Sequence, residues 1–156
     1  GTYDGKNVKL YVNGILRDST PQSGVIKSSG DLFLGTRSGI DSVFEGALDE
    51  VRIYSMALSD SEVYSLYQST FEKGLIGYWS MDENTVIGSS LLDTLNRSSA
   101  FMNNGPSIVN GYSNEAIQLD GVDDYVQING SDFDNLQEIT VATWIKYAYE
   151  PKDLNR

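Results

Sequence analysis

The 156-residue sequence contains neither cysteine nor histidine. Without cysteine the chain forms no disulfide and no thiolate metal site, and without histidine it cannot build the Ser-His-Asp or Cys-His arrangements of nucleophilic catalysis. Long apolar runs are missing as well, and none approaches the roughly 20 residues that a membrane-spanning helix needs. The remaining chemistry rests on carboxylates, hydroxyls, lysine and tyrosine, and a metal ion would need the oxygen ligands that suit Ca²⁺ or Mg²⁺.

Positive charge is scarce. Eleven Lys and Arg stand against 22 Asp and Glu, which gives a formal net charge of −11. Such a surface repels phosphate backbones and anionic lipid, so we expect neither nucleic acid nor a membrane among the partners. A cysteine-free, acidic sequence rich in Gly, Asn, Ser and Tyr is typical of secreted β-modules, and we therefore expect an extracellular or cell-surface location.

Short β-branched and aromatic runs separated by turn residues predict most of the secondary structure. One helix is predicted to begin at Ser59, where Glu62 three residues later completes a capping box. The polar stretch from 82 to 114 is interpreted as a loop-rich region. Many short strands and one small helix predict an all-β sandwich. The strands are expected over residues 8–13, 15–18, 25–27, 31–35, 44–54, 74–81, 116–120, 125–128 and 139–147.

Two sets of motifs resemble halves of one family. GTYDGKNVKLYVNG, DLFLGT and FEGALDEVRIYSMALSDSEVYSLY, within residues 1–72, resemble the C-terminal half of a laminin-G-like domain of the concanavalin A-like lectin/glucanase superfamily. GLIGYWSMDE, NEAIQLDGVDDYVQI and ITVATWIK, within residues 73–156, resemble the N-terminal half of the same domain. The resemblance implies a jelly-roll sandwich of two antiparallel sheets with one short helix.

The two halves occur in reversed order. We expect residues 1–156 to form a single, circularly permuted sandwich, because isolated halves would expose apolar strand edges. The alternative is two half-domains of a tandem array. Neither end supplies the strands that usually lie between the TWIK motif and the TYDG turn. Segments 8–13 and 139–147 are therefore expected to lie near each other beside an open sheet edge, which favours a homodimer.

An acidic turn suggests a metal site. Asp120, Asp123 and Asp124 cluster in LDGVDD, and clustered carboxylates resist ionisation unless a cation is bound. The resemblance implies that Asp120 and Asp49, the Asp of the DEVRIY strand, lie near a structural Ca²⁺ that links the two halves. The alternative is a hairpin turn whose tip residues are simply solvated.

No catalytic constellation is evident. Glu50 and Arg52 are two residues apart on one strand and are expected to form a structural ion pair. The resembled glucanases need carboxylates at alternating positions, whereas Asp49 and Glu50 are adjacent and should point to opposite faces. We therefore expect no enzymatic activity. Trp79 and Trp144 lie in predicted core strands and are expected to be buried.

The function expected is that of a non-catalytic carbohydrate-binding or adhesion module. Asn- and Gly-rich loops with a tyrosine offer amides for sugar hydroxyls and a ring for stacking, although the same residues build ordinary turns. The alternative is a ligand-free structural spacer of a large surface protein. A glycoside hydrolase fragment is the third interpretation, and the motifs speak against it. The expected partner is a glycan or polysaccharide, and the residues expected to bind it are Asn103, Asn104, Tyr112 and Asn114.

Overall fold

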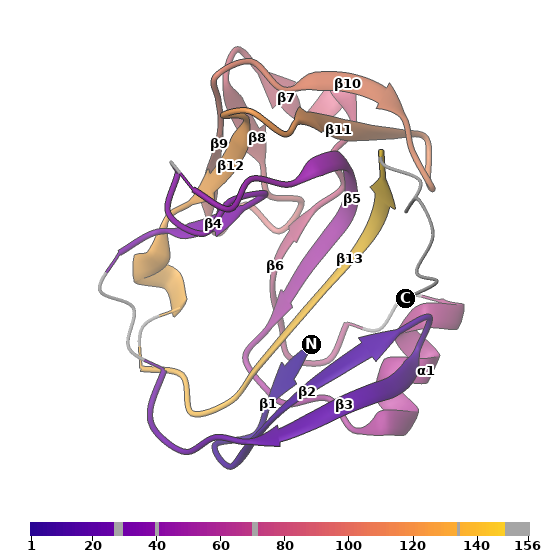
Figure 1. The fold of residues 1–156 in the computed structure, drawn as a ribbon, viewed down its shortest axis with the longest axis vertical. Coiled ribbons are helices and arrows are strands. Elements are labelled where there is room, and N and C mark those ends of the chain that lie inside the picture. Colours follow the sequence, from indigo (N-terminus) through magenta and orange to yellow (C-terminus); the bar gives the residue numbers. More distant parts are fainter. Residues whose placement is uncertain (27–29, 40, 70–71, 134, 149–156) are drawn as a thin grey trace, which may run out of the picture.

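Two antiparallel sheets pack face to face in the computed structural model, which describes residues 1–26, 30–39, 41–69, 72–133 and 135–148 (Figure 1). The larger sheet has eight strands and the smaller sheet has five. Among the described residues there is one α-helix. The all-β sandwich predicted from the sequence is therefore confirmed.

The larger sheet joins strands from both ends of the chain. Its order is β10-β11-β5-β13-β1-β2-β3. One edge of β5 is shared by two strands, since β11 pairs with its first half and β6 with its second half. Thr2 of β1 pairs with Lys9 of β2 on one side and Thr140 of β13 on the other, so segments 8–13 and 139–147 lie near each other, as predicted. The strands are β1 (Thr2–Tyr3), β2 (Asn7–Val12), β3 (Ile15–Pro21), β5 (Glu45–Tyr54), β6 (Leu75–Trp79), β10 (Ser107–Asn110), β11 (Glu115–Asp120) and β13 (Ile139–Tyr147).

The smaller sheet contains strands that the sequence did not suggest. Its order is β4-β12-β9-β8-β7, and three of these strands lie in the region expected to be loop-rich. They were missed because only one residue in each of β8 and β9 is fully buried, so no clear alternation marks them. Val25 and Ile26 lie outside any strand, and the rest of expected strand 25–27 is outside the described residues. The strands are β4 (Leu32–Leu34), β7 (Val86–Ile87), β8 (Ser90–Leu92), β9 (Ser99–Asn103) and β12 (Tyr125–Ile128).

The hydrophobic core lies between the two sheets. Trp79 is fully buried there, as predicted. In β11 the core residues Ile117 and Leu119 are two positions apart, which is the period of a strand. We call the side of the larger sheet that contacts the core its inner face and the opposite side its outer face. The core contains Leu48, Val51, Ile53, Trp79, Met81, Leu91, Ala100, Ile117, Leu119, Val126, Ile128 and Phe133.

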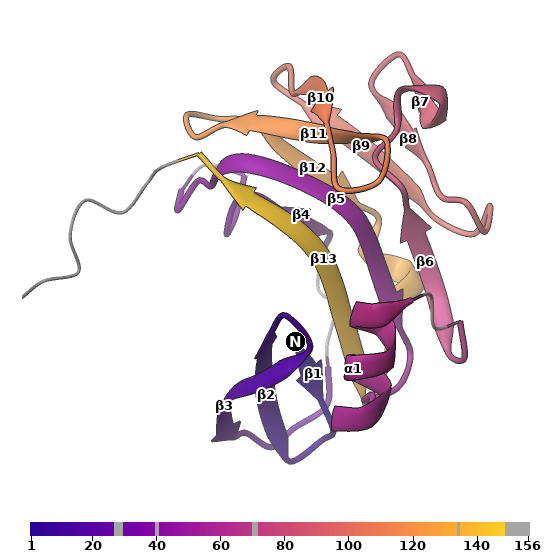
Figure 2. The same ribbon diagram turned by 90° about the vertical axis from the view of Figure 1, so that its right-hand side faces the viewer.

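The predicted helix, α1 (Asp60–Gln68), lies against the outer face of the larger sheet (Figure 2). Ser59 caps it: the Ser59 hydroxyl accepts from the Glu62 amide, and the Glu62 carboxylate accepts from the Ser59 amide at 2.8 Å. The predicted capping box is confirmed. In the described part of the chain, no helix is long and apolar enough to cross a membrane.

A β-bulge in β5 decides which side chains reach the outer face. Glu50 has a φ of +54°, and the register with β13 shifts so that Asp49 pairs with Trp144 while Arg52 pairs with Ala142. The extra residue breaks the alternation, and Asp49 and Glu50 both lie on the outer face. The expectation that these adjacent carboxylates point to opposite faces is wrong, because it assumed a regular strand.

Candidate functional site

An aromatic stack lies on the outer face at the middle of β13. The ring of Tyr112, from the loop between β10 and β11, stacks on Trp144 with centroids 3.7 Å apart. Tyr67 of α1 contacts Trp144 from another side, with centroids 5.5 Å apart. Trp144 is only partly buried and lies outside the core, contrary to our expectation. Thr140, Ala142 and Trp144 are alternate residues of β13, and all three pair with outer-face residues of β5. The Trp144 side chain therefore lies on the outer face.

Asp49 lies beside this stack and is only 3% exposed. Its Oδ2 atom accepts from the amides of Tyr112 at 2.7 Å and Ser113 at 2.9 Å, which fixes the loop to β5. Its Oδ1 atom is buried and has no hydrogen-bond partner among the described residues. Burial raises the pKa of Asp49 above its usual value, and the two loop amides oppose that shift. The structure therefore leaves one buried carboxylate oxygen unsatisfied.

Asp49 lines a groove of about 360 Å³, which we call the Asp49–Tyr112 groove. The small residues Ala47, Gly111 and Ala116 leave room for the groove. Glycine is required at position 111, because a Cβ there would lie 2.6 Å from Asp49 Oδ2. Tyr112 is 66% exposed, so one face of its ring rests on Trp144 and much of the remainder is accessible. The lining residues are Ala47, Asp49, Asn110, Gly111, Tyr112, Ala116, Trp144, Ile145 and Lys146.

A second groove of about 340 Å³ lies on the other side of Trp144, between β13, β2 and α1. The Arg52 guanidinium donates to the Glu50 carboxylate, which confirms the predicted ion pair. The same carboxylate accepts from the Tyr78 hydroxyl at 2.9 Å, and the Arg52 guanidinium lies 4.3 Å from the centroid of the Tyr78 ring. Burial, followed by the hydrogen bond to Glu50, raises the pKa of Tyr78 to about 12. Glu50 is thus fully engaged by its neighbours.

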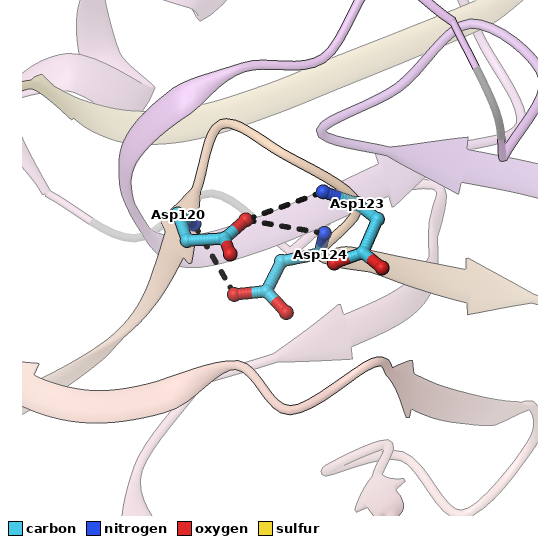
Figure 3. A group of neighbouring side chains, drawn as sticks. All are labelled: Asp120, Asp123 and Asp124. Atoms are coloured by element: carbon cyan, nitrogen blue, oxygen red, sulfur yellow. Dashed lines mark hydrogen bonds between the residues drawn. The ribbon is translucent and has the colours of Figure 1, made fainter.

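The acidic turn forms a compact carboxylate cluster between β11 and β12 (Figure 3). Asp120 Oδ1 accepts from the amides of Val122, Asp123 and Asp124 at 2.8, 3.3 and 3.4 Å, and these amides lower its pKa, the Val122 amide most. Asp124 is 5% exposed, and burial raises its pKa. One carboxylate oxygen from each of Asp120, Asp123 and Asp124 lies within 4.8 Å of the others, so the cluster could hold a metal ion.

Asp49 is not part of this cluster. Asp120 pairs with Glu45 of β5, and Asp49 lies four residues further along that strand, a separation of roughly 13 Å. The Asp49 carboxylate is held instead by the β10–β11 loop. The structure therefore does not bring Asp49 and Asp120, the expected metal pair, together. The neighbours of Asp120 in the cluster are Asp123 and Asp124 of the same turn, because the amides of this turn donate to the Asp120 carboxylate.

The four residues expected to bind a ligand occupy two separate places. Tyr112 and Asn114 share the β10–β11 loop, where the Asn114 carbonyl accepts from the Gly111 amide at 3.0 Å. Asn103 ends β9 beside the acidic turn, and Asn104 follows it, where its Nδ2 donates to the Asp123 carbonyl at 2.7 Å. The length of β11 separates the two places by roughly 20 Å. Tyr112 of the first place lines the Asp49–Tyr112 groove.

Sequence reasoning missed Trp144, Asn110 and Lys146 as groove residues. A signal for Trp144 was present, since the alternation of ITVATWIKY puts it out of phase with Ile139 and Val141. Asn110 belongs to the Asn- and Gly-rich segment 110–114, whose composition was the available signal. Nothing in the sequence marked Lys146, because it reaches the groove through the pairing of β13 with β5.

The fold defines the class of protein: an antiparallel β-sandwich whose larger sheet carries two grooves on its outer face. Residues 1–64 match the sequence model of a laminin-G family described as the concanavalin A-like lectin/glucanases superfamily. The match runs from β1 into α1 and confirms the resemblance there. Neither the curated proteins nor the solved structures include a match to the chain.

Proposed function

We propose that this chain is a non-catalytic carbohydrate-binding or adhesion module of a secreted or cell-surface protein, and that the Asp49–Tyr112 groove binds its glycan. The observation that carries the proposal is Asp49, which lines the groove and whose buried Oδ1 lacks a hydrogen-bond partner in the described part of the chain. A buried acceptor left without a donor lowers the stability by about 1–3 kcal/mol, and a charged acceptor lowers it by more. A ligand hydroxyl that donates to this oxygen would remove that cost.

The other groove residues suit a sugar. Apolar C–H faces of a pyranose stack on aromatic rings, and Tyr112 is a rigid platform because Trp144 supports it from behind. Asn110 offers amide groups and Lys146 a cationic donor at the same groove. One aromatic surface with a few fixed polar groups is the usual composition of a small-ligand site.

The geometry also supports binding without hydrolysis. Glycoside hydrolysis uses two carboxyl groups on either side of the scissile bond. Asp49 and Glu50 share the outer face but border different grooves, with Trp144 between them. The Glu50 carboxylate is occupied by Arg52 and Tyr78, and Asp49 Oδ2 is occupied by loop amides. Neither groove therefore presents a pair of free carboxylates among the described residues.

We place the structural Ca²⁺ of this module at Asp120, Asp123 and Asp124. The donor set fits the ion, since Ca²⁺ takes carboxylate and carbonyl oxygens and the three carboxylates converge. The ion would supply positive charge next to Asp124, whose burial otherwise disfavours its ionised form. This site is separate from the proposed glycan site, at the opposite end of β11.

An array of plant and marine polysaccharides tests the proposed function. We expect the wild-type chain to bind, and we expect both Tyr112→Ala and Asp49→Asn to lose the signal. The asparagine can still accept from the loop amides, but it replaces the free acceptor by a donor. Tyr64→Ala is the matched control, because Tyr64 is 52% exposed on α1 and belongs to neither groove.

Three outcomes would contradict all or part of the proposal. Binding that survives in both groove variants would place the glycan elsewhere. An array on which the folded wild-type chain binds nothing would favour the ligand-free spacer. Release of reducing ends from a bound polysaccharide would contradict the non-catalytic assignment alone.

A further inference from the structure

The smaller sheet has an outer face of its own, the side that is turned away from the hydrophobic core. Strand pairing places one residue from each of the five strands in a continuous line across this face, and we call this line the cross-strand row. The neighbours of its members in the sequence, among them Ala100, Val126 and Ile128, belong to the core, so the row itself points outward. In the order of the sheet, the row consists of Phe33 of β4, Gln127 of β12, Phe101 of β9, Ser90 of β8 and Ile87 of β7.

Apolar and polar side chains alternate along the cross-strand row. Phe101 is 44% exposed and Ile87 is 65% exposed, and the Phe33 ring contacts the edge of the Tyr125 ring with centroids 5.6 Å apart. Paired strands lie about 4.8 Å apart, so the apolar members of the row recur roughly every 9.6 Å, with a hydrogen-bonding side chain between each two. The row therefore offers three apolar contacts at regular intervals rather than one continuous apolar patch.

This face is uncharged on a strongly acidic protein. None of the described strands of the smaller sheet contains a charged residue, although the net charge of the chain is −11. Asp31, which precedes β4, accepts from the side-chain amide of Gln127 and from the backbone amide of Gly130. These contacts fix the Gln127 amide on the row. An uncharged face with ordered polar groups is complementary to a neutral ligand.

We propose that the outer face of the smaller sheet binds one chain of a neutral, extended β-linked polysaccharide of the cellulose, mannan or chitin type, which crosses the strands along the cross-strand row. Such a chain advances by about one strand spacing per sugar, and successive sugars are turned over. Every second sugar therefore presents the same side to an apolar member of the row. The sugars between them meet the Gln127 amide and the Ser90 hydroxyl, which can each donate and accept a hydrogen bond. This site is separate from the Asp49–Tyr112 groove and does not depend on it.

The spacing of the cross-strand row favours a polysaccharide over a protein partner. An extended polypeptide presents the side chains of one face about every 6.6–6.8 Å, which is out of step with the row. A stable interface with a second copy needs a continuous apolar centre, whereas polar side chains interrupt this row. Neighbouring strands are rotated by about 20–25°, so the row follows a twisted line. A single chain with rotatable linkages can follow that line, and a flat crystalline surface cannot.

Retention on insoluble polymers tests the proposal. The probes are swollen, amorphous cellulose, mannan and chitin in large excess over the protein, because a face that contacts each sugar from one side binds too weakly to survive the washing of an array. We expect at least one polymer to deplete the wild-type chain from solution. Phe101→Thr should weaken this binding by about fivefold or more, because the ring is lost while the β-branched side chain suits the strand. Leu16→Thr, at a 38% exposed position of β3, is the matched control and should bind normally. Thermal unfolding checks that each variant is folded, and Ile87→Thr replaces Phe101→Thr if the latter is not.

The outcomes separate this site from the groove. A folded wild-type chain that none of the three polymers retains would overturn the proposal and leave the array test of the groove unaffected. Equal binding by the wild type and the folded row variant would also overturn it, as would an equal loss in Leu16→Thr. Retention that is lost with Tyr112→Ala and kept by Phe101→Thr would assign the polymer to the Asp49–Tyr112 groove, which supports the proposed function and contradicts the site on the smaller sheet.

Discussion

Replacing Arg52 by methionine tests whether the Glu50–Arg52 pair is a structural element of the outer face. The Arg52 and Glu50 side chains are only 10% and 9% exposed. Without the guanidinium, the Glu50 carboxylate stays buried with the Tyr78 hydroxyl as its remaining side-chain partner. Breaking a buried pair by removing one partner costs about 3–5 kcal/mol. For a chain of this length, each kcal/mol lowers the melting temperature by about 2–4 °C, so we expect a decrease of roughly 6–20 °C.

A double-mutant cycle separates the pair from the packing of the two side chains. Glu50→Gln in the Arg52→Met background removes the uncompensated charge and should restore part of the lost stability, since the effects of contacting residues are not additive. Arg17→Met is the control, because Arg17 is exposed on β3, and it should change stability by no more than about 0.5 kcal/mol. Urea and thermal unfolding followed by circular dichroism give the free energies. A loss below about 1 kcal/mol for Arg52→Met, or strictly additive effects, would refute the reasoning.

Three further predictions concern metal, pH and assembly. Chelation by EGTA should lower the melting temperature, because a ligand at 100 times its dissociation constant stabilises by about 2.7 kcal/mol, and Asp124→Asn should abolish the difference; identical curves with and without EGTA would contradict a calcium site. The pKa of Tyr78 is raised to about 12, so its contribution to stability is present below pH 10 and is lost as the pH rises from about 10 to about 12. Tyr78→Phe should remove that share of the alkaline destabilisation, and an unchanged pH profile would show that Tyr78 is not its source. The outer edge of β3 is unpaired within the described residues, so light scattering should detect a homodimer, whereas a constant monomer mass up to millimolar concentration would contradict the expected assembly.

Local patterns were sufficient for much of the secondary structure. The Ser59 and Glu62 pair predicts the start of α1 because a capping box needs residues only three positions apart. The turn at Asn13 and Gly14 predicts the hairpin of β2 and β3, and both residues have positive φ in the structure. β7, β8 and β9 of the smaller sheet escaped prediction, because this part of the sheet is held through the pairing of β9 with β12, which lies further along the sequence.

Fewer contacts of the candidate site could be predicted from residues that are neighbours in the sequence. The ion pair of Glu50 and Arg52 could be predicted because both residues lie on one strand, two positions apart. The shared orientation of Asp49 and Glu50 could not, because the bulge forms only where β5 pairs with β13. The separation of Asp49 from Asp120 could not be predicted for a related reason: the register between β5 and β11 places Asp120 opposite Glu45.

The sequence by itself determined the chemistry that this protein can use. The lack of cysteine and histidine, the net charge of −11 and the alternating strands limit it to an acidic β-sandwich with oxygen ligands and aromatic surfaces. The tertiary structure decided which of these groups meet. The contact of Asp49 with the Tyr112 amide joins residues 63 positions apart. Such contacts follow from strand register and sheet order, which are set by burial across the whole chain rather than by neighbouring residues.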